Sequence, residues 1–182
     1  RAFSLGDQKF QEGNQLQAIP FYEQSIELDP NFALAYARLG TIYSNWGQTD
    51  AAEQYQRQAF ELKERISERE RLYIAAHYYA DSGQIEKGIA AYEMYKQTYP
   101  RDSTPPNNLA ALYSSVGQYP KALENARLAV DLNPDTYTGY FNMAYACLAL
   151  NRLDEAKSIM KSALQRNLSG SDVHLLLGAV AW

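Results

Sequence analysis

The chain has 182 residues, which is enough for one ordinary domain or for an array of short repeats. Apolar residues make up 46% of it, and the net charge of -4 gives no basic surface of the kind that nucleic acid or an anionic membrane attracts. A single cysteine, Cys147, excludes an internal disulfide, and with two histidines we expect no metal site and no cofactor.

The chain repeats itself with a period of 34 to 36 residues. Short polar turns recur at Gly13, Gly47, Gly83, Gly117 and Asn151. Five residues after each turn comes a small residue, namely Ala18, Ala52, Gly88, Ala122 or Ala156. Glycine, and next to it asparagine, tolerates the left-handed conformation that ends a helix, and small residues let two helices approach closely. Each unit therefore predicts two antiparallel helices joined by a tight turn.

In chain order, the predicted units cover residues 1–32, 33–68, 69–102, 103–136 and 137–170, with a partial unit at 171–182. Proline closes three of them, at Pro30, Pro100 and Pro134, because it cannot continue a helix interior. The second unit has Glu64 in that place, so we expect its second helix to run through Glu61 to about Glu68. No run of alternating β-branched residues predicts a strand. The expected fold is one all-α array over residues 1–182, with about eleven helices.

The last predicted helix, 171–182, is apolar on nearly all sides, and a repeat array normally covers such a surface with a further unit. We therefore expect the native protein to continue past Trp182. We also expect the chain without that continuation to show homo-association through this C-terminal helix.

These features resemble the tetratricopeptide repeat (TPR) family, whose pattern places Leu-Gly, Tyr, Gly, Ala and Pro at fixed offsets in 34 residues. The second unit matches at Tyr36, Leu39, Gly40, Tyr43, Gly47, Ala52 and Ala59. The fourth unit matches at Leu109, Ala110, Tyr113, Gly117, Ala122, Ala129 and Pro134. The pattern departs at Lys9, where tyrosine is usual, and at Gly88, where alanine is usual. The resemblance implies a right-handed α-solenoid of stacked antiparallel helix hairpins that binds a protein or peptide.

A weaker resemblance links the stretch from Leu62 to Tyr73 to the repeat regions of bacterial serine/threonine kinases and related regulators. It implies a docking or sensory region of a larger bacterial protein, in the cytoplasm. The kinase motifs themselves are absent from the sequence, and so is any Ser-His-Asp or Cys-His motif, so we expect no enzyme.

In the TPR family the first helix of each hairpin lines a concave groove. Register with the matched positions places seven candidate contacts for a partner there: Asn45, Tyr73, His77, Asp81, Asn107, Phe141 and Tyr145. Asparagines suit a peptide main chain, and aromatic rings suit apolar side chains. Some family members instead clamp the carboxylates of heat-shock chaperone tails, but the comparable positions here include one base, Arg38, which argues against a clamp.

Several of these residues also fit an ordinary packing role. Tyrosines at Tyr36, Tyr43, Tyr79, Tyr113 and Tyr140 have the helical spacing of a packing face. For Tyr73 and Tyr145, both a packing role and a binding role are open. We expect His77 to line the groove as a polar side chain rather than to coordinate a metal ion. The remaining function hypotheses are a binding scaffold and, alternatively, a self-association module that brings together an attached effector domain.

Overall fold

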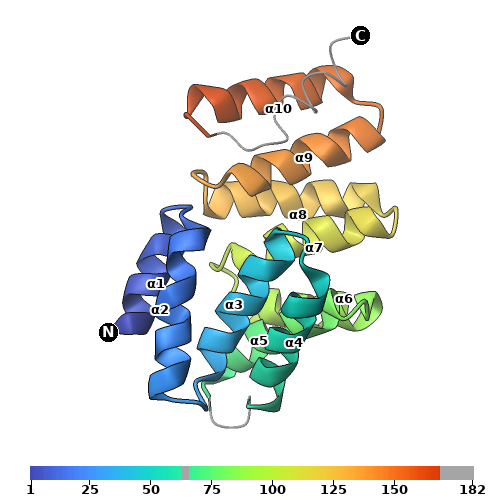
Figure 1. Ribbon diagram of the computed structural model, residues 1–182. Helices are drawn as coiled ribbons and strands as arrows, with labels where there is room; N and C mark the ends of the chain where they lie inside the picture. Colours follow the sequence, from blue (N-terminus) through green and yellow to red (C-terminus); the bar gives the residue numbers. More distant parts are fainter. Residues whose placement is uncertain (63–65, 169–182) are drawn as a thin grey trace. The chain divides into compact units, whose positions relative to one another are not determined.

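The computed structural model describes residues 1–62 and 66–168, and over these residues the chain forms ten α-helices and no strand (Figure 1). Their bounds are α1 (Ala2–Gln11), α2 (Gln15–Leu28), α3 (Ala33–Asn45), α4 (Thr49–Glu61), α5 (Glu68–Asp81), α6 (Ile85–Thr98), α7 (Thr104–Ser115), α8 (Tyr119–Leu132), α9 (Tyr137–Ala149) and α10 (Leu153–Gln165). The predicted all-α solenoid class of stacked hairpins is confirmed. The expected eleventh helix falls on 171–182, outside the described residues.

Every predicted turn joins the two helices of a pair. Gly13, Gly47, Gly83 and Gly117 all have a positive φ, and Asn151 takes the same conformation at φ 59°. After glycine, asparagine is the residue that tolerates this conformation best, so the fifth turn can form without a glycine. The turn predictions are therefore confirmed.

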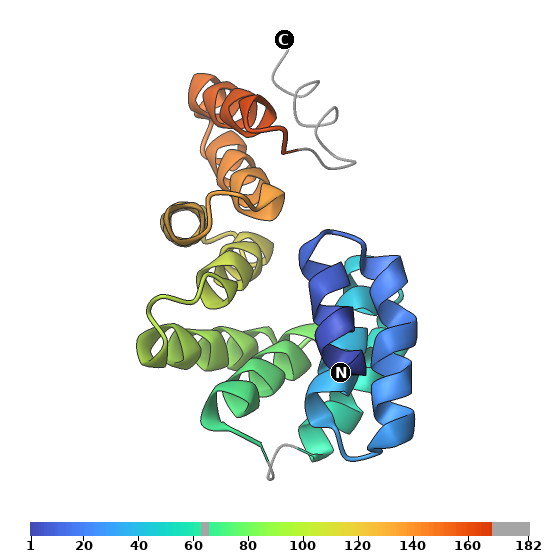
Figure 2. The same cartoon turned by 90° about the vertical axis from the view of Figure 1, so that its left-hand side faces the viewer.

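The helices divide into two compact units, Arg1–Ala91 and Tyr92–Trp182. In the first unit α1 packs on α2, α3 packs on α4, and α3 also contacts α5. In the second unit α7 packs on α8, α8 on α9, and α9 on α10, a succession that Figure 2 shows in yellow to red. The helix α6 begins in the first unit and ends in the second. That the whole chain forms one array stays a prediction.

Small residues let the paired helices come close, as the repeat predicted. Ala18, Ala52, Ala122 and Ala156 are at most 1% exposed. Gly40 shows how tight the contact is, because a Cβ atom there would lie 2.7 Å from Cγ of the buried Gln56. The predicted packing face is confirmed as well, since all five of its tyrosines are buried or half-buried.

One expected element boundary is wrong. The second helix of the second unit ends at Glu61 and does not continue to about Glu68, because α5 starts there with its own cap. The Ser67 side chain accepts a hydrogen bond from the Glu70 N–H, and the Ser67 N–H donates to Glu70 Oε2 at 2.9 Å. This reciprocal capping box satisfies two groups that a helix start leaves unpaired. None of the described helices is both long and apolar enough to cross a membrane.

Candidate binding surfaces on the first helices of the hairpins

The seven candidate residues fall into two groups, one in each compact unit. Asn45 ends α3, and Tyr73, His77 and Asp81 lie on α5. The second unit holds Asn107 on α7, and Phe141 and Tyr145 on α9. Each group is described within its own unit.

In the first unit, an internal polar network joins four helices around Arg38. Arg38 Nε donates to Asp7 Oδ1 at 2.9 Å, and Arg38 Nη1 donates to the Tyr73 hydroxyl at 2.9 Å. The Tyr22 hydroxyl donates to the same Asp7 oxygen at 2.8 Å, and the Tyr73 ring centroid lies 4.9 Å from Arg38 Cζ. Burial and the hydrogen bond to Asp7 raise the pKa of Tyr22. Arg38, the base at the positions compared with a carboxylate clamp, is thus already paired.

Tyr73 and His77 are buried, each 7% exposed. Their rings lie 4.1 Å apart, and His77 Nδ1 is 2.9 Å from the Tyr73 carbonyl oxygen. Burial lowers the pKa of His77 to about 4, with a smaller contribution in the same direction from the charge of Arg38. The neutral imidazole packs inside the unit, and its direct contact with a partner stays a prediction.

The other two candidates of the first unit are more accessible. Asp81 is half-buried and accepts a hydrogen bond from Ser44 Oγ at 2.9 Å. Burial raises the pKa of this carboxyl group, although hydrogen bonds from Ser44 and Gln56 oppose the rise. Asn45 is exposed, with its amide nitrogen 3.4 Å from Gln15 Oε1.

In the second unit, three aromatic rings follow each other along α9. The ring centroids of Tyr137 and Phe141 are 6.0 Å apart, and those of Phe141 and Tyr145 are 6.4 Å apart. Tyr145 is 45% exposed and Phe141 is half-buried. We call these three residues the aromatic ladder. Tyr137 was missed from the sequence, although its spacing of four residues from Phe141 is the signal that finds it.

Beside the ladder, two asparagine side chains from neighbouring hairpins meet. Asn142 Nδ2 of α9 donates to the main-chain oxygen of Asn107 at 3.2 Å and to Asn107 Oδ1 at 3.4 Å. Within the described part of the chain, Asn107 Nδ2 and Asn142 Oδ1 have no hydrogen-bond partner. We call these two residues the amide pair. Asn142 was also missed, since the repeat pattern gives it no special position.

Charged side chains are segregated in the second unit. The first helices α7 and α9 contain no Asp, Glu, Lys, Arg or His, and they contact each other directly. The second helices α8 and α10 carry charges of both signs, at Lys121, Glu124, Arg127, Asp131, Asp154, Glu155, Lys157 and Lys161. The surface formed by α7 and α9, which we call the uncharged face, therefore combines one exposed ring, that of Tyr145, with half-buried aromatic and amide side chains.

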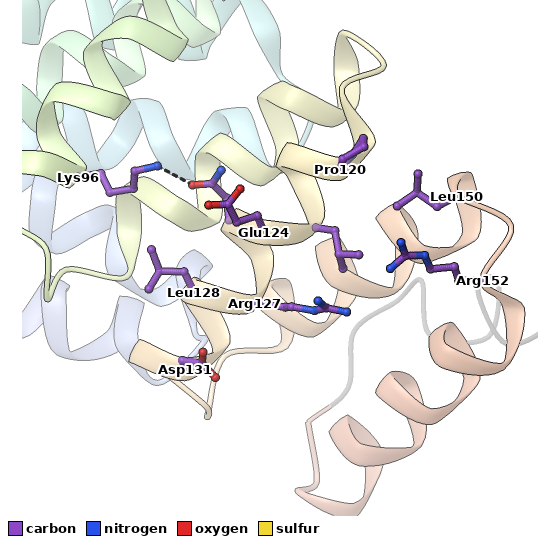
Figure 3. Close-up of a pocket in the computed structure, with 10 residues that line it drawn as sticks. Lys96, Pro120, Glu124, Arg127, Leu128, Asp131, Leu150 and Arg152 are labelled. Carbon is purple, nitrogen blue, oxygen red and sulfur yellow. Dashed lines mark hydrogen bonds between the residues drawn. The ribbon is translucent and has the colours of Figure 1, made fainter.

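A separate open pocket of about 490 Å³ lies on the charged side of the second unit (Figure 3). It is lined by Lys96, Pro120, Leu123, Glu124, Asn125, Arg127, Leu128, Asp131, Leu150 and Arg152. Its bases are already paired: Lys96 Nζ donates to Asn125 Oδ1 at 3.0 Å and lies 2.8 Å from Glu93 Oε2, while Arg127 and Arg152 both pair with Glu155. The pocket therefore offers no unpaired base to an anion.

Two features of the described residues bear on metal binding and on thiol chemistry. No group of three or more His, Cys, Asp and Glu side chains there is placed to hold a metal ion. Cys147 is fully buried, and burial raises the pKa of its thiol, so the reactive thiolate is disfavoured.

Comparison with known proteins matches this architecture. Models of the tetratricopeptide repeat match residues 3–32, 21–54 and 114–180, which together make up more than half of the chain. The chain belongs to the tetratricopeptide repeat family.

Three similar proteins illustrate the relationship. Heat shock protein STI1 of Saccharomyces cerevisiae is 34% identical over 83 residues, which is 43% of this chain but 14% of that protein. A thermophilic TPR protein of Thermus thermophilus, TTC0263, has a TM-score of 0.76 at 19% identity and covers 100% of this chain and 98% of its own. The TPR2AB domain of yeast Sti1, in a complex with pHSP90, has a TM-score of 0.60 at 15% identity. The match covers 97% of this chain and 83% of that one. The likeness to these solved structures shows the fold. The resemblance to the repeat regions of bacterial kinases stays a prediction.

Proposed function

We propose that the chain is a non-catalytic scaffold that binds a protein or peptide, and that the uncharged face of the second unit is a principal contact surface. The main support for this proposal is the aromatic ladder. Its Tyr145 end is exposed, and it lies on the uncharged face formed by α7 and α9. Tyrosine and other large rings supply much contact area at a low entropic cost, which is why they dominate binding hot spots. The complex named for the yeast Sti1 neighbour supports a binding role for this type of fold.

The first unit suits an acidic peptide tail poorly. Arg38 is held by Asp7 and Tyr73, so a ligand carboxylate would have to displace an existing ion pair. Asn45 and Asp81 remain accessible enough to contribute contacts of a different kind. This arrangement supports the prediction, made from the sequence, that the protein does not use a carboxylate clamp.

Two further functional expectations stay predictions. The alternative of homo-association through the C-terminal helix rests on residues 171–182, which lie outside the described residues. The role as a docking or sensory region of a larger bacterial protein rests on the weaker sequence resemblance, and so does a cytoplasmic location.

Selection of peptides from a displayed library against the whole chain tests the proposed function. The affinity of selected peptides is measured by fluorescence anisotropy for the wild type and for Tyr145→Ala. Loss of a hot-spot ring costs about 2 kcal/mol, so we expect binding to weaken roughly 30-fold. Leu164→Ala is the matched control, because Leu164 is a similarly exposed apolar side chain, 39% accessible, on α10. The proposal is overturned if no selected peptide distinguishes Tyr145→Ala from Leu164→Ala.

A further inference from the structure

The open pocket on the charged side of the second unit is a surface separate from the uncharged face. None of its lining residues belongs to α7 or α9. Four of them are apolar, namely Pro120, Leu123, Leu128 and Leu150. Its volume of about 490 Å³ lies in the range of roughly 300–1,000 Å³ that is usual for binding pockets. The pocket therefore has room for several side chains rather than for a single ion.

The bases that line the pocket are compensated by ion pairs inside the unit. Lys96 pairs with Glu93, and Arg127 and Arg152 share Glu155. Figure 3 shows Lys96 on one side of the labelled α8 residues and Arg152 on the other. These pairs therefore flank α8 without adding an uncompensated positive charge to the pocket.

Two lining carboxylates, in contrast, are not compensated. Glu124 and Asp131 are exposed, and among the described residues neither takes part in an ion pair or a hydrogen bond. Arg127 lies within about one helical turn of both, but it pairs with a carboxylate of α10 instead. Lys121, three residues before Glu124, has its Nζ 5.1 Å from the ring centroid of a tyrosine of α7. Charge complementarity therefore favours a cationic ligand.

The spacing of these side chains favours a helical ligand. Glu124, Leu128 and Asp131 occupy positions i, i+4 and i+7 of α8 and so share one face of that helix. Seven residues of helix span about 10.5 Å. A ligand helix that runs alongside α8 repeats its own side chains at the same spacing. In an extended segment the same-side positions lie about 6.6 and 13 Å from the first, so they match this stripe poorly.

We infer that this pocket binds a basic amphipathic helix of a partner protein. Two cationic side chains of that helix, seven residues apart, lie beside Glu124 and Asp131, and its apolar side chains contact Leu123 and Leu128. This inference does not rest on the proposed function, because it concerns a different surface. The second unit then offers separate contacts to two ligands, a basic helix on α8 and another partner on the uncharged face.

The test uses the whole 182-residue chain and fluorescently labelled synthetic peptides of about 15 residues, held helical by a hydrocarbon staple. The first peptide has two arginines seven residues apart, with two leucines between them on the same helix face. The second has the same composition, but its arginines lie on the opposite face. In the third, glutamates replace the arginines. The fourth lacks the staple and has proline in place of a central alanine, which prevents the helix.

We expect the first peptide to bind at least tenfold more tightly than the other three, measured by fluorescence anisotropy at about 50 mM sodium chloride. One exposed ion pair contributes up to about fivefold in affinity. Glu124→Gln combined with Asp131→Asn should therefore weaken binding about tenfold or more. Glu27→Gln is the matched control, because it removes an exposed carboxylate of α2 that does not line the pocket.

The apolar contact is tested by Leu128→Ala, which should weaken binding of the first peptide severalfold. Leu164→Ala is its control, since Leu164 is 39% exposed and Leu128 is 37% exposed, but Leu164 does not line the pocket. Tyr145→Ala should leave this binding unchanged. Circular dichroism of each variant shows whether its helices are retained.

Four outcomes would overturn the inference. Equal binding of the first two peptides would mean a general attraction to a chain of net charge -4. Equal losses in Glu124→Gln and Glu27→Gln would show that the pocket carboxylates are not the contact. Tight binding of the proline peptide would exclude a helical ligand. Weaker binding to Tyr145→Ala, with no effect of Glu124→Gln, would move the helix to the uncharged face and leave the proposed function standing.

Discussion

Arg38 stands at the centre of the polar network that joins Asp7 and Tyr73 in the first unit. Its side chain is 22% exposed and that of Asp7 is 27% exposed, so the pair is largely shielded from solvent. Arg38→Met removes one member and leaves the Asp7 carboxylate and the Tyr73 hydroxyl without this partner. We expect the free energy of unfolding to fall by about 3 kcal/mol, as for other shielded pairs that lose one member. Urea denaturation followed by circular dichroism measures the change.

Arg127→Met is the matched control for that substitution. Arg127 also pairs with a carboxylate, Glu155, but its side chain is 51% exposed. Exposed ion pairs contribute at most about 1 kcal/mol, so this variant should stay close to the wild type. Equal losses in the two variants would mean that the network around Arg38 has no special role in stability.

His77 predicts how the stability of the fold depends on pH. Its pKa is about 4 in the folded chain and about 6.5 when unfolded. Between these values the unfolded chain binds a proton that the folded chain does not, so stability falls as the pH falls. The free energy of unfolding should drop by about 2–3 kcal/mol from this group between pH 7 and 4.5.

Comparison with His77→Gln isolates this contribution. Urea midpoints are measured for both proteins at several pH values, and Asp81, whose raised pKa acts in the opposite direction, is common to both. Relative to the wild type, the variant should gain stability as the pH is lowered. A stability difference that is constant from pH 7 to 4.5 would show that His77 does not titrate as a buried group.

The register of the repeat predicted on which face of its helix each candidate residue lies. It did not predict how deeply each side chain is buried. Tyr73 and Tyr145 occupy first helices alike, yet one is 7% and the other 45% exposed. The difference arises because Tyr73 meets Arg38 from another hairpin and His77 from its own helix. Such contacts depend on which residues converge in space, and the repeat pattern fixes only the small and apolar positions of the hairpins.

At the scale of elements, the start of α5 depends on Ser67. We expect Ser67→Ala to lower the free energy of unfolding by about 1 kcal/mol, because it removes the side-chain acceptor of the capping box. Ser103→Ala is the control, since Ser103 precedes α7 but makes no capping hydrogen bond with its side chain. Thermal unfolding of both variants provides the comparison, and an equal loss in the two would contradict the assigned role of the cap.

Helix pairs and turns were predictable because their signals are local. A positive φ requires glycine or asparagine at the position itself, so Gly47 and Asn151 could be identified from the sequence. The end of α4 was less evident, since a stretch rich in Glu, Lys and Arg also favours helix. The spacing of Ser67 and Glu70 carries the stronger signal there. A further positive φ, 60° at Asn167 just after α10, was not predicted. The repeat gave no signal for it, because the equivalent Asn133 of the fourth unit has a φ of -142°.

For the whole molecule, the segregation of charge predicts how binding responds to salt. Neutral ligands on the uncharged face gain no ion pairs, so added salt has little to screen. The dissociation constant of a library-selected peptide without charged residues should change less than about threefold between 50 and 500 mM sodium chloride. Fluorescence anisotropy measures this directly. A tenfold or larger loss of affinity at high salt would show that charged groups outside α7 and α9 form the contact.

Because charged residues and candidate binding residues lie on different helices of the second unit, its surface charge and its ligand preference can change through separate mutations. Substitutions on α8 and α10 change net charge, and with it solubility and colloidal behaviour, without replacing any residue of α7 or α9. On the proposed function, neutral substitutions at the aromatic ladder and the amide pair are expected to change ligand preference without altering the charge of the protein. A lineage that carries this repeat pair can therefore adapt to a new intracellular or extracellular medium and to a new ligand through separate mutations, with little compromise between the two.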